Sequence, residues 1–591
     1  MADERAIDRA LARWVRERSG SVLLGRAALA VGVAEGEGHA CAALDAEFTP
    51  ADLAALRAHA WVGDGSTATP FVLHDTAHLY TLRNWRHETL LAAALRARVA
   101  QRAYPLDADT LARDVGELFA GEDEQATCLQ RIAVAAAPGS GLFVLTGGPG
   151  TGKTATAVRL LLLLLRHATA CGLPPKPALA LAAPTGKAAQ RLAQSLASGV
   201  HALHAKLDRQ SPFDSLLDAI PHGEARTLHR LLGFRPLDNT FARAADNPIA
   251  ADIVVVDEAS MVDLALMRQL LTSLRPHAQL ILLGDPGQLA AVEAGSVLAD
   301  IVAHVAENAL PQPLVDRLAG ITQLTAAPPD SGAMTGHVIT LTHGWRAGHG
   351  LQRGLQALRG GDMAALESLL AREAEDDLHL YTCADAADLR SRMDAWLDTH
   401  CTTYAELTAA HASPAAALAR LRGVQILCAL REGAFGARGI NALLEQRLGA
   451  RVGIDTARAW YHGRPVLITR NDYARDLFNG DLGIALHRAD GMQVWFEDRA
   501  HGGVRSFAPR ALPEHETAWA ITIHRSQGSE YGAVAVVLPP DPLHRILSRE
   551  LLYTAVSRAT ASAEIWTTAD ALRAAVGRPI RRIGGLRERL R

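Results

Sequence analysis

The sequence predicts an α/β fold with two doubly wound parallel sheets. Apolar strands alternate with helical patterns from about residue 111 to 345, and the alternation returns from 346 to 591. This alternation is typical of parallel sheets that carry helices on both faces. Near the start of the first region, a glycine-rich turn joins a strand to a helix, as in sheets that bind phosphates. We therefore expect two α/β domains, preceded by a separate N-terminal domain.

Residues 1 to about 110 are predicted to form a mainly helical N-terminal domain. They are rich in alanine and follow helical spacing, with a strand-like interlude around Phe71 to Leu82. We interpret Trp14, Trp61 and Trp85 as exposed aromatic anchors, a residue type enriched at protein interfaces. The filling of a small core explains the same tryptophans equally well.

The glycine-rich turn "GGPGTGKT" is the strongest chemical signal. It fits the pattern G-x-x-x-x-G-K-[ST] and lies between the strand "LFVLTG" and a helix with six consecutive leucines, Leu160 to Leu165. In such a loop, backbone N–H groups surround phosphates, the lysine neutralises them and the hydroxyl ligates Mg²⁺. The leucine run is too short to span a membrane, so we expect a buried helix. The residues expected to contact a nucleotide are Gly147, Gly148, Pro149, Gly150, Thr151, Gly152, Lys153, Thr154 and Ala155.

Carboxylates and amides follow other strands of the same region. Asp257 and Glu258 end the strand of "DIVVVDEASMVD", at the edge where doubly wound sheets bind ligands. Asp257 could hold Mg²⁺ through water and Glu258 could polarise the attacking water. Gln288 in "LLGDPGQL" could sense a γ-phosphate, and Gln125 could read the edge of adenine. A solvated acidic turn and two exposed glutamines are the alternatives.

Composition excludes several classes of protein. The net charge of −3 gives no global basic field, so any nucleic-acid surface must be local. Six cysteines without a C-x-x-C pair argue against a disulfide framework and against a zinc site, and the histidines show no metal-ligand spacing. The N-terminus lacks the apolar core of a signal peptide, and no long apolar stretch follows. We therefore expect a cytoplasmic protein without membrane contact.

Two further segments predict structural boundaries. Residues 325 to 337 are rich in proline, glycine and small residues and predict a linker between the α/β domains. Short strands separated by N-G and D-G turns predict a small β insertion at about 455 to 512 in the second domain.

Taken together, the motifs resemble those of superfamily 1 DNA helicases, and most closely those of the RecD family, the α subunits of exodeoxyribonuclease V (RecBCD). The similarity covers about residues 120 to 570. It implies two RecA-like domains, an SH3-like insertion, and an ATP- and Mg²⁺-dependent enzyme that translocates 5′ to 3′ on single-stranded DNA and unwinds duplex ends. The motifs that carry the resemblance are "GGPGTGKT", "LAAPTGKAAQRL", "TLHRLLG", "VVVDEASMVD", "LLGDPGQL", "HGWRA", "WAITIHRSQGSEY" and "LLYTAVSRA".

The resemblance also assigns residues. Arg346 and Arg558 match the two arginines that reach the nucleotide from the second domain, as arginine fingers do in phosphoryl transfer. The sequence departs from the family at Arg525, where lysine is usual, and at Trp345, where tyrosine is commoner; both changes keep charge or ring character. Short polar side chains suit contacts that are blind to base sequence. The residues that the family places on DNA are Thr185, Lys187, His229, Thr522, His524, Ser526 and Gln527.

The resemblance implies a heterotrimer with RecB-like and RecC-like subunits, in which residues 1 to 110 dock onto the RecC-like subunit. We find no D-x-E-x-K-like cluster, so we expect nuclease activity in the RecB-like subunit. A stand-alone RecD-like helicase is the alternative, although the hairpin-helix-hairpin repeats usual there are not evident. A kinase or transport ATPase would lack the arginine motifs after residue 340.

The segment 233 to 248 follows "TLHRLLG" and has strand-like flanks around the turn-prone pair Asp238-Asn239. We expect a hairpin here. In similar helicases a hairpin at this place splits the duplex, but an ordinary connecting loop is an equally good interpretation.

Overall fold

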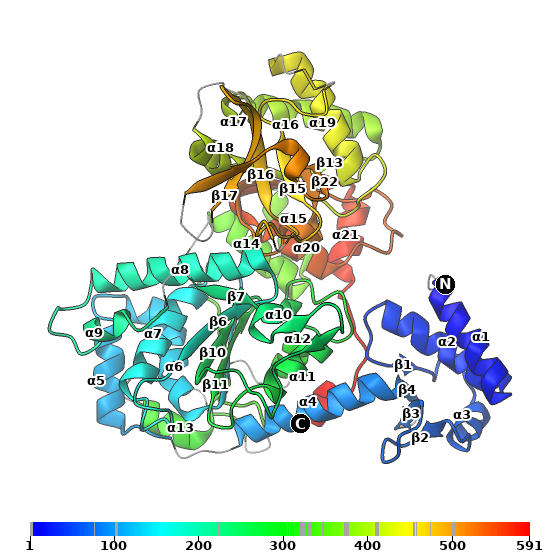
Figure 1. The fold of residues 1–591 in the computed structure, drawn as a ribbon, viewed down its shortest axis with the longest axis vertical. Helices are drawn as coiled ribbons and strands as arrows, with labels where there is room; N and C mark the ends of the chain where they lie inside the picture. Colours follow the sequence, from blue (N-terminus) through cyan, green and yellow to red (C-terminus); the bar gives the residue numbers. More distant parts are fainter. Residues whose placement is uncertain are drawn as a thin grey trace.

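The computed structural model confirms the α/β fold with parallel sheets (Figure 1). Each of two parallel sheets lies between layers of helices, and a smaller N-terminal domain lies beside the first sheet. The described residues are 4–591 except 76, 101–103, 222–223, 304, 306–307, 320, 322–325, 329–331, 346–347, 372–376, 408–412, 453–454, 457, 473 and 499–502.

The first α/β domain is built on a six-stranded parallel sheet in the order β12-β5-β11-β10-β6-β7. The four apolar strands expected from the sequence are β5, β11, β10 and β6, the four inner strands of this sheet. Strands β7 and β12 form the two edges of the sheet. The strands are β5 (Leu142–Gly147), β6 (Leu179–Ala183), β7 (Ala225–Thr227), β10 (Ile253–Val256), β11 (Gln279–Gly284) and β12 (Val338–Leu341).

One face of this sheet carries the leucine helix α7 (Lys153–Arg166). Its leucines 160 to 164 are fully buried against sheet residues such as Phe143 and Val255, so the prediction of a buried helix is confirmed. The other helices in this domain's sequence are α5 (Ala108–Leu118), α6 (Glu124–Ala136), η1 (Ala137–Gly139), α8 (Gly186–His204), α9 (Asp214–Leu217), α10 (Leu228–Leu231), η2 (Ala259–Met261), α11 (Leu264–Thr272), α12 (Val297–Val302) and α13 (Gln312–Leu318).

The opposite face of the first sheet is covered by both ends of the chain. Helix α4 (Leu82–Val99) packs against α11, and the short helix α22 (Leu586–Arg589) packs against α4. The C-terminus lies beside α4 in Figure 1. Leu586 and Leu590 are buried in the same apolar cluster as Leu95 and Val254. Helix α4 falls within the segment 1 to 110, yet it completes the core of the first α/β domain.

The prediction that residues 325 to 337 link the two α/β domains is wrong. The chain continues from this segment into β12, which pairs in parallel with β5 and so belongs to the first sheet. The proline and glycine residues of this segment precede an edge strand of the first sheet rather than a domain boundary. The chain reaches the second α/β domain only after β12.

The second α/β domain has a five-stranded parallel sheet in the order β13-β22-β21-β14-β20. Its strands are β13 (Leu378–Thr382), β14 (Val424–Cys428), β20 (Ala520–Thr522), β21 (Tyr531–Val537) and β22 (Ala559–Thr567). Its helices are α14 (His349–Gly360), α15 (Met363–Leu370), α16 (Ala386–Thr399), α17 (Cys401–Leu407), α18 (Pro414–Leu421), α19 (Ala437–Val452), η4 (Ile523–Ser526), α20 (Arg549–Val556) and α21 (Ala569–Gly577).

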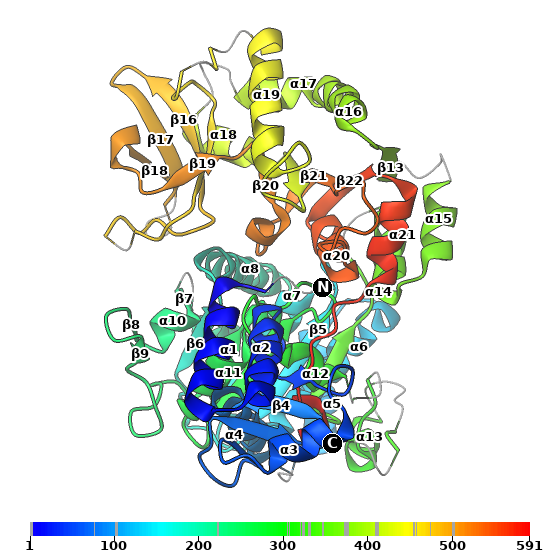
Figure 2. The same cartoon turned by 90° about the vertical axis from the view of Figure 1, so that its right-hand side faces the viewer.

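The expected β insertion is an antiparallel sheet in the order β18-β17-β16-β15-β19, which Figure 2 shows at the left side of the second domain, beside α18. It reaches residue 517, beyond the expected end at 512, because β19 pairs with β15. Its likeness to an SH3 domain stays a prediction. The elements are β15 (Pro465–Ile468), β16 (Leu482–Arg488), β17 (Gly491–Glu497), β18 (Val504–Phe507), η3 (Pro509–Ala511) and β19 (His515–Thr517).

The N-terminal domain combines helices with a four-stranded sheet, β1-β4-β3-β2. Trp14 is 53% exposed, but the interpretation of Trp85 as exposed is wrong. Trp85 is buried against Tyr80, and the guanidinium of Arg589 lies 4.1 Å from its ring centroid. The elements are α1 (Ala6–Ser19), α2 (Val22–Gly36), β1 (Ala42–Ala43), α3 (Pro50–Arg57), β2 (Val62–Gly63), β3 (Phe71–His74) and β4 (His78–Thr81).

The hairpin expected at 233 to 248 is confirmed. Strands β8 (Phe234–Arg235) and β9 (Thr240–Phe241) pair in antiparallel fashion. Asn239 in the turn has a left-handed backbone with φ of 51°, which asparagine tolerates well. Leu237 at the tip is 100% exposed.

In the part of the chain that the structure describes, no helix combines the length and apolarity that a bilayer span requires.

Candidate active site between the two sheets

The glycine-rich loop connects β5 to the N-terminus of α7. Gly150 and Gly152 have φ of 73° and 84°, in the left-handed region that favours glycine. A Cβ built at position 152 would lie 2.6 Å from Nε2 of Gln130, so the packing also requires glycine here. The loop therefore curls directly in front of a helix N-terminus, where backbone N–H groups and the helix dipole favour an anion.

Lys153, the first residue of α7, folds its amine back onto the loop. Its Nζ donates hydrogen bonds to the carbonyl oxygens of Gly147 (2.7 Å) and Gly148 (2.9 Å). Burial lowers the pKa of Lys153, while the carboxylates of Asp285 and Asp257 oppose that change. The amine is thus a poorly solvated cation, and nucleotide phosphates would provide it with a stronger partner.

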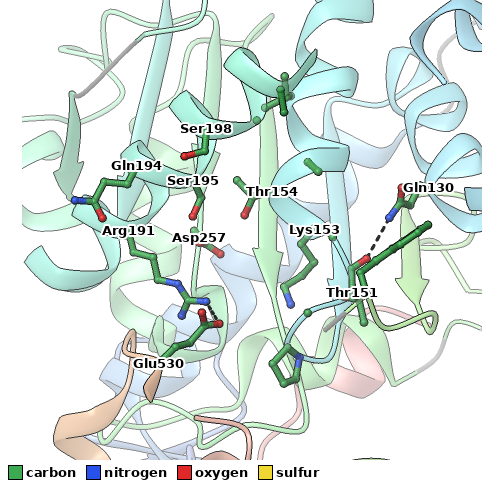
Figure 3. Close-up of a pocket in the computed structure, with 18 of the residues that line it drawn as sticks. Gln130, Thr151, Lys153, Thr154, Arg191, Gln194, Ser195, Ser198, Asp257 and Glu530 are labelled. Atoms are coloured by element: carbon green, nitrogen blue, oxygen red, sulfur yellow. Dashed lines mark hydrogen bonds and ion pairs between the residues drawn. The ribbon is translucent and has the colours of Figure 1, made fainter. Parts of the chain in front are cut away.

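The acidic pair lies at the carboxyl end of β10. Asp257 Oδ1 accepts a hydrogen bond from the backbone N–H of Glu258 (2.8 Å), and Glu258 has a φ of 51°. Burial, and secondly the charge of Glu258, raise the pKa of Asp257. Figure 3 shows Asp257, Thr154 and Lys153 directed into one pocket. A hydroxyl and a carboxylate beside a phosphate site match the ligands that Mg²⁺ takes in nucleotide complexes, so Thr154 and Asp257 fit this ion.

Arg558 reaches this site from the second α/β domain. Its side chain is 2% exposed, and Nη2 donates to Oε1 of Gln288 in the first domain. Nη1 lies 3.9 Å from Oε1 of Glu258. The guanidinium is anchored in its own domain by hydrogen bonds to the carbonyl oxygens of Thr554 (3.1 Å) and Ser529 (3.3 Å). The arginine is therefore held in place in the cavity that the phosphate loop also lines.

These groups line one cavity of about 740 Å³ between the two domains. Arg191 on α8 closes one side by an ion pair with Glu530 of the second domain, which Figure 3 shows next to Asp257. The cavity is the right size for a nucleotide and its hydration. Among the described residues, no group of three or more His, Cys, Asp or Glu side chains could hold a metal ion by itself.

Gln125 lies beside this cavity rather than in it. It is exposed and lines a neighbouring cavity of about 320 Å³ with His343. Gln130, one and a half turns further along α6, contacts the loop itself: its Nε2 donates to the carbonyl oxygen of Thr151 (3.2 Å). The adenine role of Gln125 stays a prediction. Arg346 lies outside the described residues, so its role also stays a prediction.

The residues that were expected on DNA in the first domain lie at the starts of two helices. Thr185 caps α8 by accepting a hydrogen bond from the N–H of Ala188 (3.2 Å), and Lys187 follows in the first turn. His229 on α10 is exposed and packs against Phe234 and Phe241 of the hairpin, with ring centroids 5.2 and 5.9 Å apart. His229 is therefore tied to the hairpin.

The corresponding residues of the second domain surround η4, which begins directly after Thr522. His524 is exposed, whereas Ser526 is fully buried and donates to the carbonyl oxygen of Ile523 (2.7 Å). Gln527 donates across the domains to the carbonyl oxygen of Leu289 (3.3 Å). In this conformation Ser526 supports the turn and Gln527 joins the two domains, so of these side chains His524 is the most available to a ligand.

The residues expected on DNA in the first domain lie close to those expected on DNA in the second. A Cβ built at Gly528, just after η4, would lie 3.4 Å from Ala188 in the first turn of α8. The sequence pattern indicates no role for Gln130, Arg191, Glu530 or Tyr553, although the last three lie within the motifs quoted above. Only their pairing across the fold reveals them.

A phosphate loop on one parallel sheet and an arginine from a second, in contact with the same cavity, define a nucleotide-driven motor of the helicase class. The models of two families match the chain: the AAA domain at residues 130–294 and the UvrD-like helicase C-terminal domain at residues 517–564. The second match contains Gln527 and Arg558.

Curated relatives identify the family. The RecBCD enzyme subunit RecD of Mycobacterium tuberculosis is 39% identical over 547 residues, which cover 92% of this chain and 84% of the relative. The subunit RecD of Haemophilus influenzae is 32% identical over 538 residues, 86% of this chain and 79% of the relative. The chain belongs to the RecD family of helicases.

Two more distant similarities complete the comparison. The ATP-dependent RecD2 DNA helicase of Deinococcus radiodurans is 31% identical over 464 residues, 76% of this chain and 50% of that protein. The crystal structure of Pif1 helicase from Candida albicans aligns with 76% of this chain and 95% of its own, at 16% identity and a TM-score of 0.36.

Proposed function

We propose that this chain hydrolyses ATP in the cavity between its α/β domains and uses the cycle to move 5′ to 3′ along single-stranded DNA and unwind duplex ends. One observation carries the proposal: Arg558 of the second domain meets Gln288 and Glu258 of the first at the phosphate loop. A site shared in this way ties hydrolysis to the relative position of two domains, which a translocating motor requires.

Within the cavity each residue has a role in phosphoryl transfer. The loop and Lys153 bind the phosphates. Thr154 and Asp257 would hold Mg²⁺, which would neutralise phosphate charge. Glu258 orients and polarises the attacking water, and Arg558 stabilises the charge on the transferred group. Gln288 reports the γ-phosphate to Arg558 through their hydrogen bond.

DNA runs over the adjoining turns that begin α8 and η4. Thr185, Lys187, Thr522 and His524 lie at these turns, where short polar side chains and backbone N–H groups suit contacts with the phosphate backbone. Such contacts ignore base sequence, as a motor must. The hairpin β8–β9 packs against His229 of the first domain through Phe234 and Phe241. It splits the duplex in front of the moving domains.

The motor works in a heterotrimer with RecB-like and RecC-like subunits, in double-strand break repair and homologous recombination, and the RecB-like subunit cuts the DNA. The names of the M. tuberculosis and H. influenzae relatives, which are RecBCD subunits, support this proposal. A stand-alone 5′ to 3′ helicase is the second candidate, because the D. radiodurans relative is named RecD2. Co-purification of the untagged chain from its own cell, followed by identification of bound proteins, separates the two.

Strand displacement on tailed duplexes tests the activity. We expect ATP-dependent unwinding of a duplex with a 5′ single-stranded tail and none with a 3′ tail of equal length and sequence. A blunt duplex and omission of ATP are the controls. Unwinding only from the 3′ tail would contradict the proposed direction, and no unwinding from any substrate, alone or with partners, would contradict the helicase assignment.

A further inference from the structure

A buried tyrosine of the second domain makes a hydrogen bond with a buried carboxylate of the first. Tyr553 on α20 is 2% exposed, and its Oη donates to Oδ2 of Asp285 at 2.8 Å. Burial and the charge of Asp285 raise the pKa of the Tyr553 hydroxyl. The hydroxyl therefore keeps its proton and acts as the donor.

Asp285 gathers donors from both domains. Its Oδ1 accepts the N–H of Gly287 (3.0 Å), and its Oδ2 accepts Nε2 of Gln288 (3.3 Å) as well as the Tyr553 hydroxyl. The amide oxygen of Gln288 in turn accepts Nη2 of Arg558. Asp285 thus fixes the orientation of the Gln288 amide, with its oxygen toward Arg558 and its nitrogen toward the carboxylate.

Helix α20 makes a second contact with the first domain and touches the phosphate loop. Thr554, next to Tyr553, accepts the backbone N–H of Leu289 through its hydroxyl (2.8 Å). A Cβ built at Gly148 would lie 3.2 Å from Tyr553 Oη, so the hydroxyl lies directly against the phosphate loop. Tyr553 is therefore placed where the phosphate loop, the segment 285 to 289 and the second domain meet.

We infer that Tyr553 is a positioning residue for ATP hydrolysis, which acts through Asp285 to orient Gln288 when the two domains are together. The inference rests on the proposed function and deepens it. Moving α20 away breaks the bond from Tyr553 to Asp285 together with the bond from Arg558 to Gln288. The first domain alone can then bind nucleotide, but the γ-phosphate sensor and the arginine lose their alignment. The hydroxyl couples domain position to the chemical step.

The substitution Tyr553→Phe tests this, because it removes the hydroxyl and keeps the ring. Loss of a hydrogen bond to a charged partner corresponds to roughly a tenfold change in an equilibrium or a rate. We expect kcat for DNA-stimulated ATP hydrolysis by the full chain to fall about tenfold, with KM for ATP changed less than about twofold. Tyr531→Phe is the matched control: Tyr531 is equally buried in the same domain, and its hydroxyl has no hydrogen-bond partner among the described residues.

A double variant separates positioning from packing. If Tyr553 acts through Asp285, then Tyr553→Phe added to Asp285→Asn lowers kcat no further than Asp285→Asn alone. Equal losses for Tyr553→Phe and Tyr531→Phe, multiplicative losses in the double variant, or a Tyr553→Phe chain with normal kcat would each overturn the inference. A wild-type chain without DNA-stimulated hydrolysis would instead overturn the proposed function, and the inference with it.

Discussion

Arg558 in the second α/β domain and Gln288 in the first are joined by a hydrogen bond, although 270 positions separate them in the sequence. Both side chains are buried, so the bond forms only when the two domains are together. The nucleotide site is therefore not complete on either sheet alone.

Replacing Arg558 should affect hydrolysis far more than binding. We expect Arg558→Ala to lower DNA-stimulated kcat by roughly 10³-fold or more, the range seen when an arginine finger is removed. The phosphate loop stays intact, so affinity for a fluorescent ATP analogue should change little. Thermal unfolding checks that the buried substitution leaves the fold in place. A folded variant with near-normal turnover would show that Arg558 does not act on the phosphates.

The hairpin should matter for duplex DNA and not for single strands. Removal of residues 236 to 239 deletes the whole turn between β8 and β9 and so prevents the two strands from pairing. This deletion should impair strand displacement and spare the ATPase activity on single-stranded DNA. Leu237→Asp, at the fully exposed tip, should have the same effect in milder form, because an apolar tip can stack on a base pair and a carboxylate repels phosphates. Equal loss of both activities would assign the segment to general motor function.

The tryptophans and apolar helix faces of the N-terminal domain predict a docking surface for a partner subunit. The structure shows which substitutions can test this prediction without disturbing the fold. Deletion of residues 1 to 110 would remove α4, which packs in the core of the first α/β domain. Surface substitution of Ile7 and Trp14 on α1 is cleaner, because both side chains are more than half exposed. We expect Ile7→Ser with Trp14→Ser to reduce co-elution with a RecC-like subunit at unchanged ATPase activity.

The control for that experiment is Leu543→Ser, which removes a large apolar side chain that is also more than half exposed, on the second α/β domain. Full co-elution of the α1 variant, or equal loss for the control, would place the docking surface elsewhere.

The sequence pattern predicts correctly those elements whose structure depends on interactions between neighbouring residues. The phosphate loop, the leucine helix and the strand before Asp257 each carry their signal within a few residues, because hydrophobic period and glycine content act at short range. The turn at Asn239 belongs to the same group.

What the sequence could not predict depends on distant partners. Trp85 is buried because the C-terminal segment folds back over it, with Arg589 against its ring. The proline- and glycine-rich segment before β12 indicates a domain linker, and only the pairing of β12 with β5 places this strand in the first sheet. Arg191 and Glu530, like Asp285 and Tyr553, are ordinary residues until the two domains come together.

Asp300 on α12 should make stability depend on pH. Burial and the nearby charges of Glu88 and Glu588 raise its pKa to about 7. The folded state therefore holds a proton that the unfolded state loses above its ordinary pKa of 3.8, so stability falls as pH rises from about 4 to 7. We expect Asp300→Asn to remove this penalty and stabilise the chain at pH 8 by on the order of 2 kcal/mol, with little effect at pH 4. Thermal unfolding at both pH values measures it, and an equal shift at both would contradict the titration.

ATP turnover by the full chain, with and without single-stranded DNA, should differ sharply between the wild type and Lys153→Gln. The Nζ of Lys153 contacts only loop carbonyls among the hydrogen bonds of the described residues, so its charge serves bound phosphates rather than core packing. We predict hydrolysis that DNA stimulates in the wild type, and a folded Lys153→Gln chain with the thermal unfolding of the wild type and no DNA-stimulated turnover. Near-normal turnover by that folded variant would contradict the assignment of the phosphate loop as the site that drives the motor.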